Sequence, residues 1–244
     1  MDSYNEHKLS TVNCQLRIFM MRNKYEQTGL TGNQLKILAM IFMTCDHVGM
    51  QLLPQMVFLR IIGRLAMPIY AFMIAEGCRH TRSRKKYLLR LVSMAGLCQV
   101  VYLVAMGSAY QCILVTFSLS VVLICLAEQA EKGKKLPLYA AMAAVFFICV
   151  VLPDLWKGTD FAVDYGLAGV LLPVFIYFGG TKGLLAGMAI VALGNNGGIQ
   201  WFSLGAVPLL MLYNGQRGRA NLGKLFYWYY PVHLAVIYGL SLIL

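Results

Sequence analysis

The chain has 244 residues, of which 59% are hydrophobic and only 13% are charged, and its mean hydropathy is +0.65. Soluble domains carry about one quarter charged residues. The composition therefore excludes an ordinary globular enzyme and indicates an integral membrane protein. The formal net charge is +11; membrane orientation explains this excess, so we expect no nucleic-acid partner.

The seven cysteines are scattered singly along the chain and form no CxxC pair. We expect them to be small buried side chains, as free cysteines commonly are. No group of histidine, cysteine and carboxylate residues has the spacing of a metal site, so we predict no bound metal.

Residues 1–34 form a mixed, polar and basic N-terminal arm on the expected cytoplasmic side. They lack the basic start, apolar centre and small-residue cleavage site of a signal peptide, so we expect none to be removed. Val12, Leu16 and Phe19 recur at roughly helical spacing, which is typical of a helix lying on an anionic membrane face. A disordered arm explains the composition equally well. Residues 35–244 form one transmembrane domain in this interpretation, because no repeat or linker divides them.

Apolar segments follow one another from residue 35 to the end of the chain. A helix needs about 20 apolar residues to cross hydrocarbon. Six segments approach this length: 35–53, 57–76, 87–107, 111–127, 137–152 and 225–244. Three shorter ones are separated by glycine-rich turns, and two of them could instead form a re-entrant hairpin: 166–179, 183–194 and 199–213. We predict an all-α, polytopic transmembrane helical bundle of about nine spans, with eight to ten possible.

The basic residues test this arrangement, because lysine and arginine in short loops stay on the cytoplasmic side. With nine spans, all basic clusters fall on one face: Arg22, Lys24 and Lys36, then 79–90, 131–135, Lys182 and 214–224. The loops of the opposite face are poor in basic residues, and one of them, 153–164, is acidic. The pattern predicts a cytoplasmic N-terminus and an external C-terminus.

Ionisable residues inside a membrane are costly and usually face the interior of the bundle. Five such residues stand out: Asp46, His47, Arg60, Arg64 and Glu76. A rise of ~1.5 Å per residue places His47 roughly 16 Å beyond Lys36, at a depth similar to that of Arg64 on the antiparallel neighbour. Neighbours on a helix point about 100° apart, so we expect Asp46 to pair with Arg64 and leave His47 free. Glu76 belongs to a layer nearer the cytoplasm.

The last apolar segment contains FYWYYPVHLAVIY, in which His233 follows a proline that we expect to kink the helix. His233 either lines a functional site or is only hydrogen-bonded to its neighbours. The other candidates have structural alternatives too. Asp46 and Arg64 could merely fix helix packing, and the basic run 79–90 could merely set orientation.

The order of these motifs resembles the TraX family of bacterial membrane proteins, which is named after the factor that acetylates conjugative pilin. The resemblance covers about residues 31 to 240, and its most specific part is GRLAMPIYAFMIAEG followed by RHTRSRKKYLLR. Weaker matching stretches are LKILAMIFMTCDH, DYGLAGVLL, YNGQRG and KLFYWYYPVHL. The family is similar to transmembrane acyltransferases, many of which have an arginine, ten residues and then a histidine. Here Lys36 takes the place of the arginine before His47, and lysine lacks the planar fork of arginine.

The resemblance implies an integral O- or N-acetyltransferase of the bacterial cytoplasmic membrane. It would move the acetyl group of cytoplasmic acetyl-CoA to a pilin-like peptide or a cell-envelope glycan at or across the bilayer. The alternative from the residues alone is a proton-coupled small-molecule transporter, which would also bury aspartate, histidine and arginine.

Within the acetyltransferase hypothesis, His47 is the general base, because an imidazole titrates near neutral pH. Arg64 would stabilise the oxyanion or hold Asp46 in place. Whether transfer is direct or passes through an acetyl-histidine stays open. The candidates for binding acetyl-CoA are Lys36, Glu76, Arg79, His80, Arg82, Arg84, Lys85, Asn214, Arg217 and His233.

Overall fold

The structure is a computed structural model that describes residues 29–194, 198–220 and 222–243. Within these ranges the chain is helical and has no β-strand, only two isolated bridges. The predicted all-α class is thus confirmed over the described residues. The expected N-terminal arm lies almost entirely outside them.

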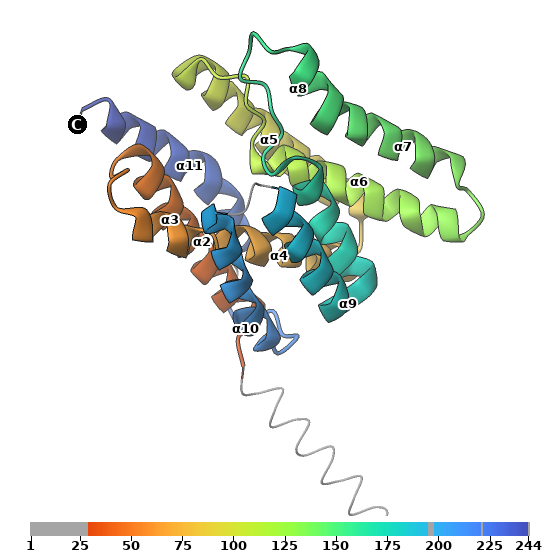
Figure 1. The fold of residues 1–244 in the computed structure, drawn as a ribbon. Helices are drawn as coiled ribbons and strands as arrows, with labels where there is room; N and C mark the ends of the chain where they lie inside the picture. Colours follow the sequence, from red (N-terminus) through yellow and green to blue (C-terminus); the bar gives the residue numbers. More distant parts are fainter. Residues whose placement is uncertain (1–28, 195–197, 221, 244) are drawn as a thin grey trace, which may run out of the picture.

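Twelve helical elements follow one another along the described chain. They are α2 (Gly32–Gln51), α3 (Val57–Gly63), α4 (Ala66–His80), α5 (Arg84–Met106), α6 (Ile113–Glu131), α7 (Leu136–Phe146), η1 (Phe147–Val151), α8 (Leu152–Leu155), α9 (Gly166–Gly194), η2 (Gly198–Gly205), α10 (Ala206–Met211) and α11 (Gly223–Ser241). Figure 1 shows α2, α3 and α11 on one side and α5 to α8 on the other, with α4 and α9 between them.

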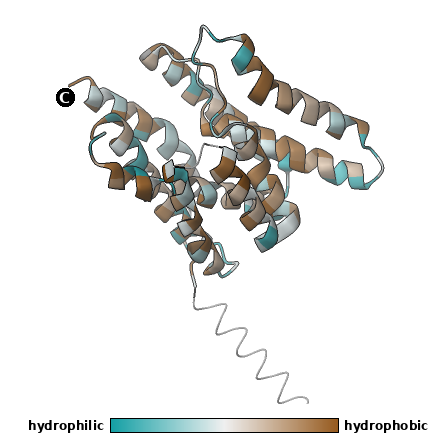
Figure 2. Ribbon diagram, viewed as in Figure 1, coloured by the Kyte–Doolittle hydropathy of each residue, from teal (hydrophilic) through white to brown (hydrophobic). Residues whose placement is uncertain are grey.

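Five segments are long and apolar enough to cross a membrane: Val57–His80, Arg84–Val104, Ile113–Glu131, Leu136–Leu155 and Gly166–Gly194. Hydrophobic residues cover much of the helices, and many of the hydrophilic ones lie at helix ends and in loops (Figure 2). The protein is therefore a membrane protein by its described helices. The number of nine spans and the cytoplasmic N-terminus stay predictions.

Helices α2 and α3 touch because two glycines remove the side chains between them. A Cβ on Gly63 would lie 2.3 Å from the Cβ of Asp46, and one on Gly49 would lie 2.9 Å from the Cβ of Leu59. Backbones can approach this closely only where small residues face each other. The contact brings the arginines of α3 next to Asp46.

Helix α4 lies at the centre of the fold. Its side chains at Ile69, Ala71 and Ala75 have no exposed surface, and it packs against α2, α6, α9 and α10. The segment Leu136–Leu155 is instead mostly exposed, which suits a helix that faces lipid.

Helix α9 is a hairpin rather than one straight span. Gly180 has φ 54° and ψ −132°, a conformation that interrupts the helix. Gly183 packs on the backbone of Phe175, and Gly187 packs on Leu172, so the two arms run antiparallel. Each arm of about 14 residues is ~21 Å long, less than the ~30 Å of hydrocarbon. The predicted segments 166–179 and 183–194 therefore form the two arms of one helical hairpin.

The hairpin gives a test of the fold with a matched control. A Cβ on Gly183 would lie 1.8 Å from the carbonyl oxygen of Phe175, whereas one on Gly179 would meet nothing within 4 Å. We expect Gly183→Ala to lower the free energy of unfolding by about 2 kcal/mol or more, and Gly179→Ala to be neutral or slightly stabilising. Thermal unfolding in nanodiscs measures both, and equal stability of the two variants would contradict the hairpin.

Candidate functional site

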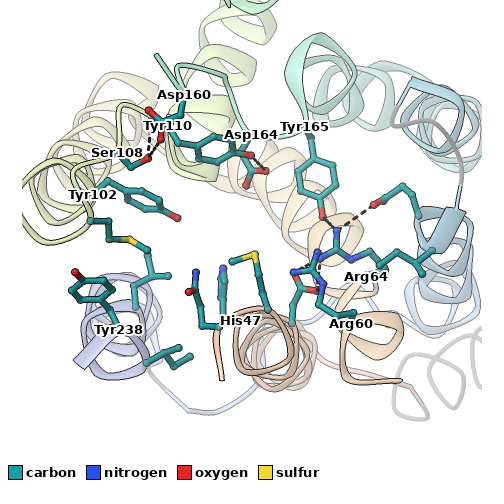
Figure 3. A pocket seen from close by; sticks show the side chains of 18 residues that line it. His47, Arg60, Arg64, Tyr102, Ser108, Tyr110, Asp160, Asp164, Tyr165 and Tyr238 are labelled. Carbon is teal, nitrogen blue, oxygen red and sulfur yellow. Dashed lines mark hydrogen bonds and ion pairs between the residues drawn. The ribbon is translucent and has the colours of Figure 1, made fainter. Parts of the chain in front are cut away.

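A cavity of about 610 Å³ lies where α2, α5 and α11 end, and we name it the histidine cavity. Helix α3 with the residue that follows it, the loops at 107–112 and 156–165, and η2 complete its walls (Figure 3). Its chemically active lining residues are Asp46, His47, Arg60, Arg64, Tyr110 and Asp164. All three catalytic candidates named from the sequence thus meet in one cavity.

An ion-pair cluster forms one wall of this cavity. The guanidinium of Arg64 donates to both carboxylate oxygens of Asp46, as the depth comparison predicted. The Nε atom of Arg60 lies 3.6 Å from Asp46 Oδ1, so the carboxylate holds two cations. Arg64 Nη1 also donates to the hydroxyl of Tyr165 at 3.3 Å and to Gln200 Oε1 at 3.5 Å. The cluster therefore joins α2, the end of α3, the loop before α9, and η2.

His47 does not stand alone, because a second imidazole contacts it. The Nε2 atom of His233 lies 2.9 Å from His47 Nδ1, and His233 Nδ1 lies 2.9 Å from the carbonyl oxygen of Tyr229. The ring of Tyr229 stacks on His233 with an interplanar angle of 7°. The structure thus places His233 beside His47, whereas the sequence suggested a position along the path of acetyl-CoA.

A second cavity, of about 440 Å³, lies at the opposite ends of α2, α5 and α11, and we name it the basic cavity. Four of the residues predicted to bind acetyl-CoA line it: Lys36, Glu76, His80 and Arg217. Arg90, Tyr70, Tyr87 and Phe226 complete much of the wall. The basic cavity therefore combines cationic and aromatic side chains at the end of the bundle that faces away from His47.

Two other candidate arginines are engaged in contacts between helices. Arg79 donates to Glu76 and to the carbonyl oxygens of Ile176 and Tyr177, each at 2.6 to 2.7 Å. These carbonyls lie near the end of the first arm of α9. Arg84 pairs with Glu128 on α6 and donates to the Tyr177 hydroxyl at 2.8 Å. Both arginines thus fix the α9 hairpin against α4, α5 and α6.

The remaining candidates, Arg82, Lys85 and Asn214, do not line either cavity. Arg82 and Lys85 are exposed at the start of α5. The amide of Asn214 donates to the carbonyl oxygen of Gly29 at 3.4 Å, and its oxygen accepts from the backbone N–H of Gln216. In this structure Asn214 shapes a turn.

A small apolar cavity of about 30 Å³ lies between the two larger ones. It shares Tyr70, Ile74, Phe226 and Tyr227 with the basic cavity. At its other end it reaches Met43 and Tyr230. Met43 precedes His47 by one helical turn, and the ring of Tyr230 lies 5.3 Å from that of His233. A few side chains therefore separate the basic cavity from the histidine pair.

Two loops close the histidine cavity on the side away from the basic cavity. Asp160 accepts hydrogen bonds from the hydroxyl of Ser108 and the backbone N–H of Ala109. The hydroxyl of Tyr110 donates to Asp164 at 2.8 Å. Tyr165, which lines the cavity, has a positive φ of 58°, an uncommon conformation for a residue with a side chain. The sequence identified 153–164 only as an acidic loop and missed these contacts.

The carboxyl of Asp164, in the loop before α9, gives a test by pH. Burial raises its pKa to about 6, although the hydrogen bond from Tyr110 and the nearby charge of Arg64 act in the opposite direction. The native state therefore binds this proton more tightly than the unfolded chain, so ionisation costs stability between about pH 4 and pH 6 and fully above pH 6. We expect Asp164→Asn to exceed the native protein in stability above pH 6, by at most on the order of 3 kcal/mol, and to match it near pH 4.

Thermal unfolding at both pH values measures this difference. Asp160→Asn is the control, because a hydrogen bond from Ser108 lowers the pKa of the exposed Asp160 and predicts the opposite sign. An Asp164→Asn variant that is less stable than the native protein at pH 7.5 would contradict the assignment.

Comparison with known proteins identifies the family of the chain. The chain is 26% identical over 245 aligned positions, which cover 84% of it and 93% of the relative, to the "Probable fimbrial assembly protein FimC, serogroup H1" of Dichelobacter nodosus. A stretch of 38 residues, 16% of this chain and 15% of the relative, is 55% identical to the "Uncharacterized protein RP591" of Rickettsia prowazekii (strain Madrid E). No solved structure gives a significant match. The family described as "TraX protein" matches residues 31–241, so the chain belongs to the TraX family.

Proposed function

We propose that the protein is an acetyl-CoA-dependent acetyltransferase of the bacterial cytoplasmic membrane, with His47 as general base. The observation that carries this proposal is the position of His47. It lies in a cavity lined by ionisable side chains, and a second cavity with cationic walls opens at the other end of the same helix. The spacing of Lys36 and His47 along α2 is about 16 Å, which sets the distance that the arm of acetyl-CoA has to cover.

The basic cavity would hold the phosphates of acetyl-CoA on the cytoplasmic side. Lys36, Arg90 and Arg217 line it, and cationic side chains bind phosphate strongly. Tyr70, Tyr87 and Phe226 provide flat apolar surfaces for the adenine. The acyl arm would enter through the small apolar cavity, where Met43 is the flexible side chain on the way to His47.

The reaction needs one proton acceptor. As the amine or hydroxyl of the acceptor forms its bond to the acetyl carbonyl carbon, His47 takes the proton from that group. The carbon–sulfur bond then breaks, and CoA leaves as a thiolate that takes up a proton. Arg64 and Arg60 line the same cavity and would stabilise the negative charge on the carbonyl oxygen in the tetrahedral intermediate.

The name of the Dichelobacter relative, a probable fimbrial assembly protein, favours a pilin-like peptide as acceptor. Such a peptide would approach from the side of the loops that close the histidine cavity. A cell-envelope glycan would approach from the same side, and its hydroxyl groups would undergo the same chemistry.

Two cavities at opposite ends of a buried histidine pair would also suit a proton-coupled transporter. Sealed proteoliposomes separate the two functions. With acetyl-CoA labelled in the acetyl group, and with a peptide bearing a free N-terminus and an amino-sugar oligosaccharide as acceptor probes, we expect CoA release and label in one probe. Proteoliposomes that neither bind nor consume acetyl-CoA would overturn the proposed function and favour the transporter.

A further inference from the structure

We propose that His233 is a positioning residue that fixes His47 in one tautomer, with the hydrogen on Nδ1 and the lone pair on Nε2. The role of this tautomer in catalysis rests on the proposed function, but the tautomer itself follows from the hydrogen bonds of the pair. His233 would thereby take the place that a carboxylate takes in many catalytic groups, where the partner of one ring nitrogen decides the state of the other.

The argument begins at the backbone of α11. The Nδ1 atom of His233 lies 2.9 Å from the carbonyl oxygen of Tyr229. A carbonyl oxygen only accepts hydrogen bonds, so Nδ1 carries the hydrogen and donates it. A carbonyl has two lone pairs, so this oxygen can also accept the ordinary helical hydrogen bond. In the neutral ring of His233, Nε2 is then left with a lone pair.

The lone pair on His233 Nε2 in turn determines the position of the hydrogen on His47 of α2. His233 Nε2 lies 2.9 Å from His47 Nδ1. Two lone pairs do not form a hydrogen bond, so His47 Nδ1 carries the hydrogen between the rings. The Nε2 atom of His47 then has the lone pair, and it is the nitrogen free to accept a proton from an acceptor molecule.

The ring of His233 is held in place from several sides. His233 is only 6% exposed. The ring of Tyr229 stacks on its imidazole, and the ring of Tyr230 meets the imidazole at an interplanar angle of 65°. The hydroxyl of Tyr229 in turn forms a hydrogen bond with Thr44 on α2, which ties α11 to α2 next to the pair. A flipped imidazole would place a C–H group against the Tyr229 carbonyl, so packing and hydrogen bonding select the same orientation.

Other titratable and charged groups line the histidine cavity together with His47. They are Asp46 on α2, Arg60 on α3, Arg64 directly after α3, Tyr102 on α5, Tyr110, Asp160, Asp164 and Tyr165 in the two loops, and Tyr238 on α11. The Asp46 carboxylate is held by the two arginines. His233 supplies the ring nitrogen that meets Nδ1 of His47, and the backbone of Met43, one helical turn earlier, also contacts this imidazole.

Two substitutions of His233 separate its two hydrogen bonds. His233→Asn places an amide nitrogen near the position of Nδ1, so it keeps a donor for the Tyr229 carbonyl and loses the acceptor for His47. His233→Gln extends to the position of Nε2, so its side-chain oxygen can still accept from His47 Nδ1. Each variant thus keeps a different one of the two hydrogen bonds, and His233→Gln keeps the contact with His47 that the proposal requires.

The first readout is the protonation of the two ring nitrogens of His47, measured by ¹⁵N nuclear magnetic resonance of histidine-labelled protein in nanodiscs. The His47→Ala variant assigns the signals. We expect the hydrogen on Nδ1 in the native protein and in His233→Gln, and a mixture of tautomers in His233→Asn. A native His47 with its hydrogen on Nε2, or a tautomer unchanged in His233→Asn, would overturn the proposal.

The second readout is catalysis. We expect His233→Asn to lower kcat by roughly 10- to 1,000-fold with little change in KM for acetyl-CoA, and His233→Gln to restore most of kcat. Equal loss in both variants would mean a merely structural role. If His233→Asn does not fold, the spectrum of the native protein and of His233→Gln still decides the tautomer. If the spectrum is as expected but native protein does not turn over acetyl-CoA, the proposed function fails and the tautomer stands.

Discussion

Replacement of His47 by alanine is expected to lower kcat for acetyl transfer by about 100- to 10,000-fold, the usual contribution of a general base. The KM for acetyl-CoA should change little, because the basic cavity lies at the other end of α2 and does not include His47. The variant should also fold, since His47 lines a cavity into which water can enter and bind the Nε2 atom of His233, which loses its partner in this variant. Release of CoA by protein in nanodiscs, followed by chromatography, measures both constants.

Cys45 provides the control for this substitution. It lies on the same helix two positions before His47 and is absent from the lining of the histidine cavity. Cys45→Ala should therefore keep kcat within a few fold of the native value. A well-folded His47→Ala variant with native turnover would show that His47 is not the base.

The second large effect is expected for Arg64→Ala. This substitution removes the guanidinium that binds both oxygens of Asp46. Breaking a fully buried ion pair commonly costs about 3 to 5 kcal/mol because one charge stays unpaired, and this pair is mostly but not fully buried. Arg60 remains 3.6 Å from the carboxylate, so we expect the lower end of this range. Chemical or thermal unfolding in nanodiscs gives the change in the free energy of unfolding.

A double substitution tests the cause of that loss. Asp46→Ala combined with Arg64→Ala removes both charges, so it should be more stable than Arg64→Ala alone. Lys85→Ala is the control for removal of a cation, since Lys85 is exposed and should change stability by less than about 0.5 kcal/mol. A stable and fully active Arg64→Ala variant would contradict the importance of the pair.

The sequence was sufficient to predict the pair of Asp46 and Arg64. Both residues lie on neighbouring helices joined by a short turn, so counting the helical rise from that turn gives their relative depth. The same counting placed Lys36 and Glu76 in a layer away from His47, and both line the basic cavity. Counting the helical rise thus predicted the relative depth of two residues where their helices are adjacent in the sequence.

The contact between His47 and His233 could not be predicted in this way. The two residues are 186 positions apart, and no count along a helix relates α2 to α11. The helices meet because both pack in the same assembled bundle. A proline two residues before His233 marked the region as unusual, but it did not show which helix His233 faces.

The cationic run 79–90 shows a different limit of prediction from the sequence. From sequence alone Arg79, Arg82 and Arg84 are equal candidates for binding phosphate. In the structure Arg79 donates to carbonyl oxygens at the end of an arm of α9, and Arg84 pairs with Glu128. These partners lie on α9 and α6, which meet α4 and α5 only in the assembled fold, so the contacts are tertiary features. The loop residues Tyr110 and Asp164 were missed for a related reason, since irregular loops have no period from which contacts can be counted.

The most direct test of the account is a structure of the protein in nanodiscs with a non-hydrolysable analogue of acetyl-CoA, determined by cryo-electron microscopy. We expect the nucleotide in the basic cavity beside Lys36 and Arg90, and the acyl carbonyl within a few ångströms of His47 Nε2, as a catalytic contact requires. An analogue bound elsewhere on the protein, or one whose acyl group stays apart from His47, would contradict the account.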